Sequence, residues 1–128
     1  MQLAYTILYV QDVAATLQFY QKAFGFKQKM LHESGDYGEL DTGQTTLSFS
    51  SLSLMKELGK NPSSPQKEHP CFEIAFTTDN VSEAFDRALQ AGAVPVQEPA
   101  EMPWGQTTAY VSDLNGFLVE ICTPIIIQ

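Results

Sequence analysis

The sequence predicts a single α+β domain, spanning residues 1–128, that is built from two βαβββ modules. Two observations lead to this prediction. The order strand, helix and three strands occurs twice along the chain, once on each side of a proline-rich stretch. In addition, corresponding dipeptides, Asp12-Val13 and Asn80-Val81, open the two expected helices, and glycines follow them at Gly25 and Gly92. A chain of 128 residues fits one domain.

The first module covers residues 1–50. A strand is expected over Leu3–Val10, which is rich in Tyr, Ile, Thr and Val. Asp12 is a suitable N-cap and Gly25 a suitable C-cap for the helix between them, because carboxylates accept from free amides and glycine ends helices. Apolar residues recur at helical spacing inside this segment at Val13, Leu17, Tyr20 and Phe24. Three more strands are expected at residues 26–33, 37–41 and 45–50.

Residues 51–70 interrupt the pattern. Leu52–Leu58 could form one or two helical turns. The remainder contains Pro62, Pro65 and Pro70 among mostly polar residues, which predicts an exposed linker.

The second module covers residues 71–124 and repeats the order of the first. Asn80 is the expected N-cap of a helix over 81–91. Asp113–Gly116 is the expected hairpin turn before the last strand. The expected strands span residues 71–78, 94–98, 107–112 and 117–123. One module leaves one face of its sheet uncovered, so we expect two modules to pair.

The charge argues against nucleic acid as a partner, since the net charge is −8 and phosphates are bound by clustered cations. No apolar run approaches the ~18–20 residues that cross a bilayer, so no membrane partner is expected. Met1–Tyr5 lacks the features of a signal peptide, and we interpret Cys71 and Cys122 as buried, reduced thiols. These features predict a cytoplasmic protein.

Several stretches resemble a known family. Leu8–Val13, Phe19-Tyr20 and Phe24–Phe26 resemble the opening of glyoxalase/bleomycin resistance protein/dioxygenase proteins, the vicinal oxygen chelate superfamily. Pro103–Gly105 and Val111–Ile121 resemble the signature of that family's second half. The resemblance covers the chain apart from the linker. It implies a partly closed, barrel-like sheet around a cavity between the modules, and a homodimer.

The resemblance also implies four residues that face the cavity from the first and last strands of each half. In metal-dependent relatives these residues are His, Glu or Gln and bind one divalent ion. Carried over to this chain, the positions hold Tyr5, Ser48, Glu73 and Glu120, and a slip in register would replace Ser48 by Leu47. Neither serine nor leucine is a useful ligand for a divalent ion. The implied set therefore has two carboxylates and no histidine.

Glu73 and Glu120 interrupt otherwise apolar strands, and a buried carboxylate without a partner is costly. Three explanations stay open. The two residues could hold a divalent metal together with Tyr5 and water. They could bind a cationic or hydroxylated ligand, or act as an acid/base pair. They could also be structural residues near solvent.

Trp104 is the only tryptophan and falls on an expected loop between strands. Its flat face could stack on an aromatic or cationic ligand, or it could be a lid packed against Tyr110 or a partner subunit. Further aromatic residues that could line the cavity are Tyr5, Tyr9, Tyr37 and Phe49. The histidines, His32 and His69, are interpreted as surface residues.

The preferred hypothesis is a metal-free protein that binds a small aromatic or cationic molecule, similar to the bleomycin-resistance members of the family, with no cofactor. The expected ligand-binding residues are Tyr5, Tyr9, Ser48, Glu73, Trp104 and Glu120. The alternative is a divalent-metal-dependent lyase, isomerase or dioxygenase with Glu73 and Glu120 as candidate catalytic residues and metal ligands. A third hypothesis is a binding module whose ligand regulates a partner protein.

Overall fold

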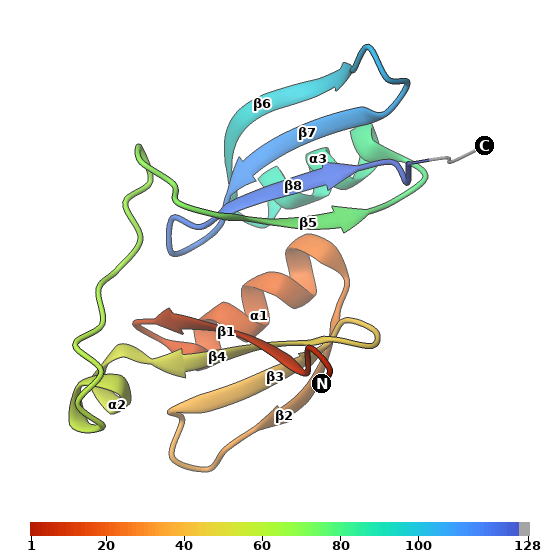
Figure 1. Ribbon diagram of the computed structural model, residues 1–128. Coiled ribbons are helices and arrows are strands. Elements are labelled where there is room, and N and C mark those ends of the chain that lie inside the picture. Colours follow the sequence, from red (N-terminus) through yellow and green to blue (C-terminus); the bar gives the residue numbers. More distant parts are fainter. Residues whose placement is uncertain (126–128) are drawn as a thin grey trace. The chain divides into compact units, whose positions relative to one another are not determined.

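A computed structural model describes residues 1–125, and the chain divides into two compact units, Met1–Ser64 and a second that begins at Pro65 (Figure 1). The first unit contains β1 (Tyr5–Val10), α1 (Val13–Phe24), β2 (Lys27–Leu31), β3 (Tyr37–Asp41), β4 (Thr46–Ser51) and α2 (Leu52–Glu57). The second contains β5 (Glu73–Thr77), α3 (Val81–Gln90), β6 (Val94–Glu101), β7 (Thr107–Ser112) and β8 (Leu118–Cys122).

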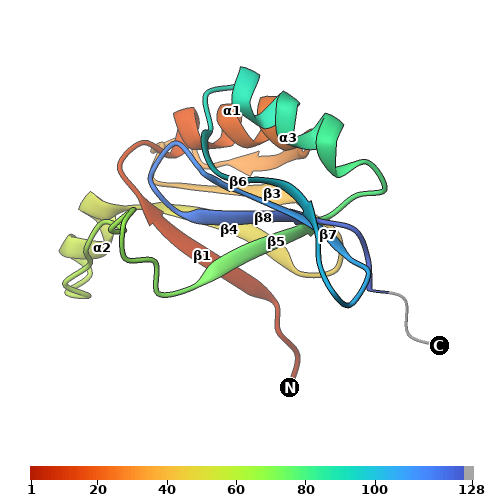
Figure 2. The same cartoon turned by 90° about the horizontal axis from the view of Figure 1, so that it is seen from above.

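Each unit has one four-stranded sheet, with the order β1-β4-β3-β2 in the first and β5-β8-β7-β6 in the second. The first and last strands of each unit pair in parallel, and the other pairs are antiparallel. Helix α1 packs on β2, β3 and β4, and helix α3 packs on β6, β7 and β8 (Figures 1 and 2). The two βαβββ modules that the sequence predicts are therefore confirmed.

The core of the first unit lies between α1 and its sheet. Tyr20 of α1 stacks on Phe49 of β4 with ring centroids 5.2 Å apart. Gly38 of β3 lies directly under the helix, where a Cβ atom would stand 2.6 Å from Leu17 Cδ1. A side chain at this position would collide with α1, which explains a glycine in the middle of a strand.

The helix ends form as the sequence predicts. The Asp12 carboxylate accepts a hydrogen bond from the Ala15 amide at 3.0 Å, and the Asn80 side chain accepts one from the Glu83 amide at 3.1 Å. Gly25 ends α1 in the left-handed conformation with φ of 77°, which residues with a Cβ adopt only at a cost. Each cap satisfies amides or carbonyls that a helix end leaves open.

Several boundaries differ by one or two residues from the sequence predictions, and the clearest differences concern β1, β6 and Cys71. Strand β1 begins at Tyr5 rather than Leu3. Strand β6 continues to Glu101 rather than Glu98, because it lies at the edge of its sheet, where prolines and an irregular register are tolerated. Cys71 is exposed rather than buried, since β5 does not begin until Glu73 and Cys71 lies before that strand.

The expected linker contains one short helix, α2, whose N-cap Ser51 accepts a hydrogen bond from the Leu54 amide at 3.1 Å. The division between the two units falls inside this stretch, between Ser64 and Pro65. None of the helices in residues 1–125 has the length and apolar character that a membrane span requires.

Candidate functional site

One face of the second sheet is covered by α3 and the other carries acidic and phenolic groups. Val119 and Ile121 of β8 are buried on the helix side. Because side chains alternate along a strand, Glu120 and Cys122 point to the opposite face. Tyr110 of β7 pairs directly with Glu120 and so shares that face. This open face is the candidate site of the second half.

Tyr110 and Glu120 are bonded to each other, with the phenol donating to Oε2 of the carboxylate. This hydrogen bond, followed by burial and the charges of Glu120 and Glu73, raises the pKa of Tyr110 above its ordinary value. The phenol therefore keeps its proton at neutral pH and acts as a donor. The influence of Glu73 on the same phenol places both expected carboxylates around Tyr110.

Cys122 is the thiol of this cluster. Burial, and then the neighbouring Glu120, raise the pKa of Cys122 to about 11. Its Sγ lies 3.7 Å from the carbonyl oxygen of Phe76, a weak hydrogen bond. Because nucleophilic attack requires the thiolate, this cysteine is poorly suited to act as a nucleophile near neutral pH.

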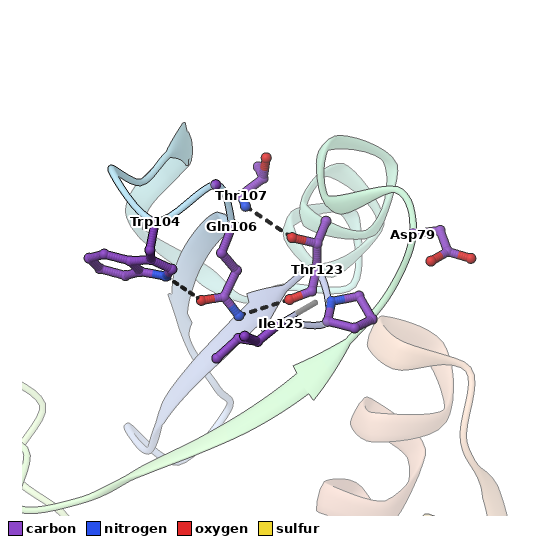
Figure 3. Close-up of a pocket in the computed structure, with 8 residues that line it drawn as sticks. Asp79, Trp104, Gln106, Thr107, Thr123 and Ile125 are labelled. Atoms are coloured by element: carbon purple, nitrogen blue, oxygen red, sulfur yellow. Dashed lines mark hydrogen bonds between the residues drawn. The ribbon is translucent and has the colours of Figure 1, made fainter. Parts of the chain in front are cut away.

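A cavity of about 470 Å³ lies at the end of the second sheet (Figure 3). Its lining residues are Asp79, Trp104, Gly105, Gln106, Thr107, Thr123, Pro124 and Ile125. The Trp104 indole donates to Gln106 Oε1 at 2.8 Å, and Gln106 Nε2 donates to the Thr123 carbonyl at 2.8 Å. Trp104 nevertheless stays 66% exposed. The indole is thus oriented by the protein and accessible at the same time.

Gln106 connects this cavity to the acidic face. Its side chain bonds to Trp104 and Thr123. Burial and Glu120 raise the pKa of Cys122, and the Gln106 side chain lies close enough to this thiol to offset part of that rise. Cys122 is in turn close enough to Glu120 for the carboxylate to raise the same pKa. The indole and the carboxylate therefore lie at two ends of one short row of side chains.

In the first half, the register of β1 and β4 selects between Ser48 and Leu47. Ser48 lies opposite Ile7, as Glu120 lies opposite Ala75 in the second half. Ser48 is therefore the residue equivalent to Glu120, and Leu47 points to the helix side. Tyr5 and Tyr9 alternate with the buried residues of β1 and so share the face of Ser48.

The structure thus gathers Tyr5, Tyr9 and Ser48 on the open face of the first sheet, and Glu73 and Glu120 on the open face of the second. Phe49, which could have lined a cavity, is instead an ordinary core residue, fully buried against Tyr20 on the helix side. The cavity expected between the two halves stays a prediction, as do the ligand-binding roles of these residues.

Sequence reasoning missed the pairing of Tyr110 with Glu120. A signal for it exists, because the backbone of Asp113 bonds to that of Phe117 and closes the hairpin turn. Tyr110 and Glu120 are equally far outside this pair, so the turn fixes their register. Glu39 of β3 was also missed. Its carboxylate accepts a hydrogen bond from the Tyr37 phenol at 2.7 Å, on the open face of the first sheet.

The side chains at the four family positions show whether this chain could bind the divalent ion of its metal-dependent relatives. Tyr5 and Ser48 offer a phenol and a hydroxyl, which are poor ligands for such an ion near neutral pH. His32 is exposed in the turn after β2, and His69 is exposed in the linker. Within residues 1–125, no group of three His, Cys, Asp or Glu side chains is placed to hold a metal ion. The donor set does not fit a resident divalent ion.

Comparisons with known proteins agree with this architecture. The chain is 31% identical to a lactoylglutathione lyase of Neisseria meningitidis, with 94% of this chain and 88% of the relative covered. A glyoxalase/bleomycin resistance protein/dioxygenase family enzyme from Burkholderia phytofirmans has the same fold, with a TM-score of 0.83 at 23% identity, covering 98% of this chain and all of that one. A glyoxalase-related enzyme from Fulvimarina pelagi also superposes, with a TM-score of 0.83 at 20% identity over 97% of this chain and 88% of the other.

The family model that matches spans residues 2–121, which includes both modules and the linker. It covers the stretches Leu8–Val13 and Val111–Ile121, where the resemblance is seen in the sequence. The chain therefore belongs to the glyoxalase/bleomycin resistance protein/dioxygenase superfamily.

Proposed function

We propose that the protein binds a small cationic aromatic molecule without a metal ion, and that Glu73, Glu120 and Trp104 contact it. The observation that carries the proposal is the uncompensated charge on the open face of the second sheet. Glu120 is bonded to a neutral phenol, and within residues 1–125 neither it nor Glu73 has a cationic partner. A cation from outside would supply the missing charge, and the overall charge of −8 favours its approach.

Trp104 supports an aromatic ligand. Its indole N–H is already bonded to Gln106, so the ring is held in one orientation before any ligand arrives. Cations placed over an indole gain about 0.5–2 kcal/mol, and the larger values apply where water is excluded. The adjoining cavity of about 470 Å³ is large enough for a small ligand.

Tyr110 has a supporting role in this proposal. Its bond to Oε2 fixes one oxygen of Glu120, which leaves the other oxygen to contact the positive charge of the ligand. The raised pKa of Tyr110 keeps the phenol neutral, so it adds no further negative charge at neutral pH. The site therefore suits binding of a cation better than removal of a proton from a substrate by Tyr110.

The experiment compares two flat molecules of nearly the same shape, the cation 1-methylquinolinium and the neutral 1-methylnaphthalene, by isothermal titration calorimetry. We expect saturable binding of the cation and about tenfold weaker binding of the neutral compound, because the neutral compound lacks both the cation–π attraction to Trp104, about 0.5–2 kcal/mol, and the attraction to the carboxylates, about 0.2–1 kcal/mol. A chelator should not change the affinity.

Glu120→Gln should weaken binding of the cation by about fivefold, as expected for the loss of a charge pair of ~1 kcal/mol. Trp104→Ala should weaken it by about twofold to thirtyfold, as expected for the loss of a cation–π contact of about 0.5–2 kcal/mol. Glu57→Gln is the matched control, because it removes one negative charge from an exposed position on α2, in the other unit. Equal binding of the charged and neutral compounds would refute the proposal, as would an unchanged affinity in Glu120→Gln.

The alternative is a divalent-metal-dependent lyase, isomerase or dioxygenase that uses Glu73 and Glu120. One finding favours it, the 31% identity to a lactoylglutathione lyase over most of both chains. Native mass spectrometry of freshly purified protein distinguishes the two functions and also reports the homodimer that the family resemblance implies. A stoichiometric divalent ion that is lost in Glu120→Gln would replace the binding proposal by the enzymatic one.

A further inference from the structure

The open face of the first sheet carries a second polar cluster, formed by Tyr37 and Glu39 of β3 and Ser48 of β4. Gly38 and Leu40 of β3 face α1, so Tyr37 and Glu39 alternate to the open side. Glu39 pairs directly with Ser48 across the two strands. The cluster is therefore set by strand register.

The two halves differ in which strand of the central antiparallel pair carries the carboxylate. In the second half, the residue pair consists of Tyr110 on the third strand and Glu120 on the fourth. In the first half, the equivalent pair has Glu39 on the third strand and Ser48 on the fourth. The carboxylate of the first half thus lies on the third strand, next to the strand that carries Glu120 in the second half. The family pattern does not include this position.

Ser48 is an incompletely satisfied residue in this cluster. Its side chain is fully buried, and within residues 1–125 its hydroxyl oxygen has no hydrogen-bond partner. Burial raises the pKa of the Tyr37 phenol, and Ser48 lies close enough to this phenol to oppose part of the shift, while Glu39 adds to it. A buried hydroxyl without a partner costs about 1–3 kcal/mol. Such a group indicates that the cluster is completed by something else.

The donors and acceptors define what would complete it. The Tyr37 phenol donates to Glu39 at 2.7 Å, and no lysine or arginine of residues 1–125 pairs with this carboxylate. If a ligand donates to Glu39 instead, the phenol is released and can donate to the nearby Ser48 hydroxyl. Binding would then satisfy both Glu39 and Ser48. An ammonium group is the donor that also neutralises the carboxylate.

We propose that Glu39 binds the ammonium group of a primary or secondary amine, with Tyr37 and Ser48 as positioning residues. The inference deepens the proposed function and rests on it in one respect, that the ligand is cationic. It adds a specificity-determining carboxylate in the first half. Anionic ligands are repelled by Glu39, and neutral alcohols leave its charge without a counterion.

The test titrates the full-length protein with benzylammonium and with the neutral benzyl alcohol, followed by backbone amide shifts in NMR spectra. We expect benzylammonium to shift the amides of Glu39 and Ser48 in a saturable way. Glu39→Gln should weaken this binding by about tenfold or more, as expected for a charged hydrogen bond. The matched control Asp41→Asn removes one charge from an exposed position on the same strand and should change the affinity less than twofold.

Ser48→Ala tests the positioning role. It should reduce the preference for benzylammonium over benzyl alcohol by about threefold to tenfold, since the gained hydroxyl contact is lost. A merely structural role would change the unfolding midpoint and leave this preference as it is. An unchanged preference in Ser48→Ala would therefore remove Ser48 from the proposal.

Two results separate this inference from the proposed function. If Glu39→Gln leaves benzylammonium binding intact while Glu120→Gln weakens binding of 1-methylquinolinium, the Glu39 site is refuted and the proposed function stands. If benzylammonium still shifts the Ser48 amide and needs Glu39, but 1-methylquinolinium does not bind, the Glu39 site stands and the proposed function fails.

Discussion

Tyr110 and Glu120 lie directly opposite each other on β7 and β8, and the phenol donates a hydrogen bond to the carboxylate. Tyr110→Phe removes the phenol and with it the hydrogen bond that Glu120 accepts. We expect a loss of about 1 kcal/mol in the free energy of unfolding, because the bond is charge-assisted but only partly buried. Urea unfolding measures this loss.

A double-mutant cycle isolates the bond from other effects of the substitutions. Tyr110→Phe should cost much less stability in a Glu120→Gln background, since the charged acceptor is already gone. Strictly additive losses in the double variant would mean that the two side chains do not interact energetically.

The two thiols should react differently with a thiol reagent in the folded protein. Cys71 is exposed, whereas Cys122 is buried and its pKa is raised to about 11. We expect one fast-reacting thiol per chain near pH 8, the Cys71 thiol, and two after denaturation. Mass spectrometry of the labelled peptides identifies the site. Fast labelling of Cys122 in the folded Cys71→Ser variant would contradict the burial of Cys122.

Stability should fall at alkaline pH. The folded chain holds the Cys122 proton up to about pH 11, whereas a thiol in the unfolded chain releases it near pH 9. Between these values the unfolded state binds fewer protons, so the free energy of unfolding decreases as pH rises. The loss of stability that this thiol causes is at most about 2–3 kcal/mol, at ~1.4 kcal/mol per pKa unit. Below pH 9 this loss is absent.

Urea midpoints measured from pH 8 to pH 11 test this expectation. Cys122→Ala should flatten the decline, and Tyr110→Phe should flatten it at the highest pH, because the pKa of Tyr110 is also raised. The same decline in wild type and Cys122→Ala would assign the effect to other groups.

Gly38 should resist substitution. A Cβ atom there would lie 2.6 Å from Leu17 Cδ1 and 3.1 Å from Val13 Cγ1, so Gly38→Ala forces these two buried side chains of α1 to repack. We expect a loss of about 1–3 kcal/mol, as in other overpacked cores. Thermal or urea unfolding measures it. In a Leu17→Ala background the added cost should shrink, and full additivity would show that the collision is relieved in another way.

The sequence alone was sufficient to predict the two modules, because the capping residues Asp12 and Asn80 act locally and alternation along a strand needs no distant partner. The same alternation placed Glu73 and Glu120 on one face. Boundaries were less accurate where edge position matters, as in β6, since pairing with a single neighbour tolerates prolines that a central strand excludes.

The tertiary structure decided what depends on register between strands. It placed Ser48 rather than Leu47 in the position equivalent to Glu120, and it turned Phe49 towards α1. It also brought Tyr110 to Glu120, and Glu39 to Ser48. The hydrophobic pattern of a strand predicts on which face of the sheet each side chain lies. A shift in register between two strands leaves the pattern of each strand unchanged, so the pattern does not predict the register. The pairing of Glu39 with Ser48, and of Tyr110 with Glu120, can therefore be seen only in the structure, where the strands are paired.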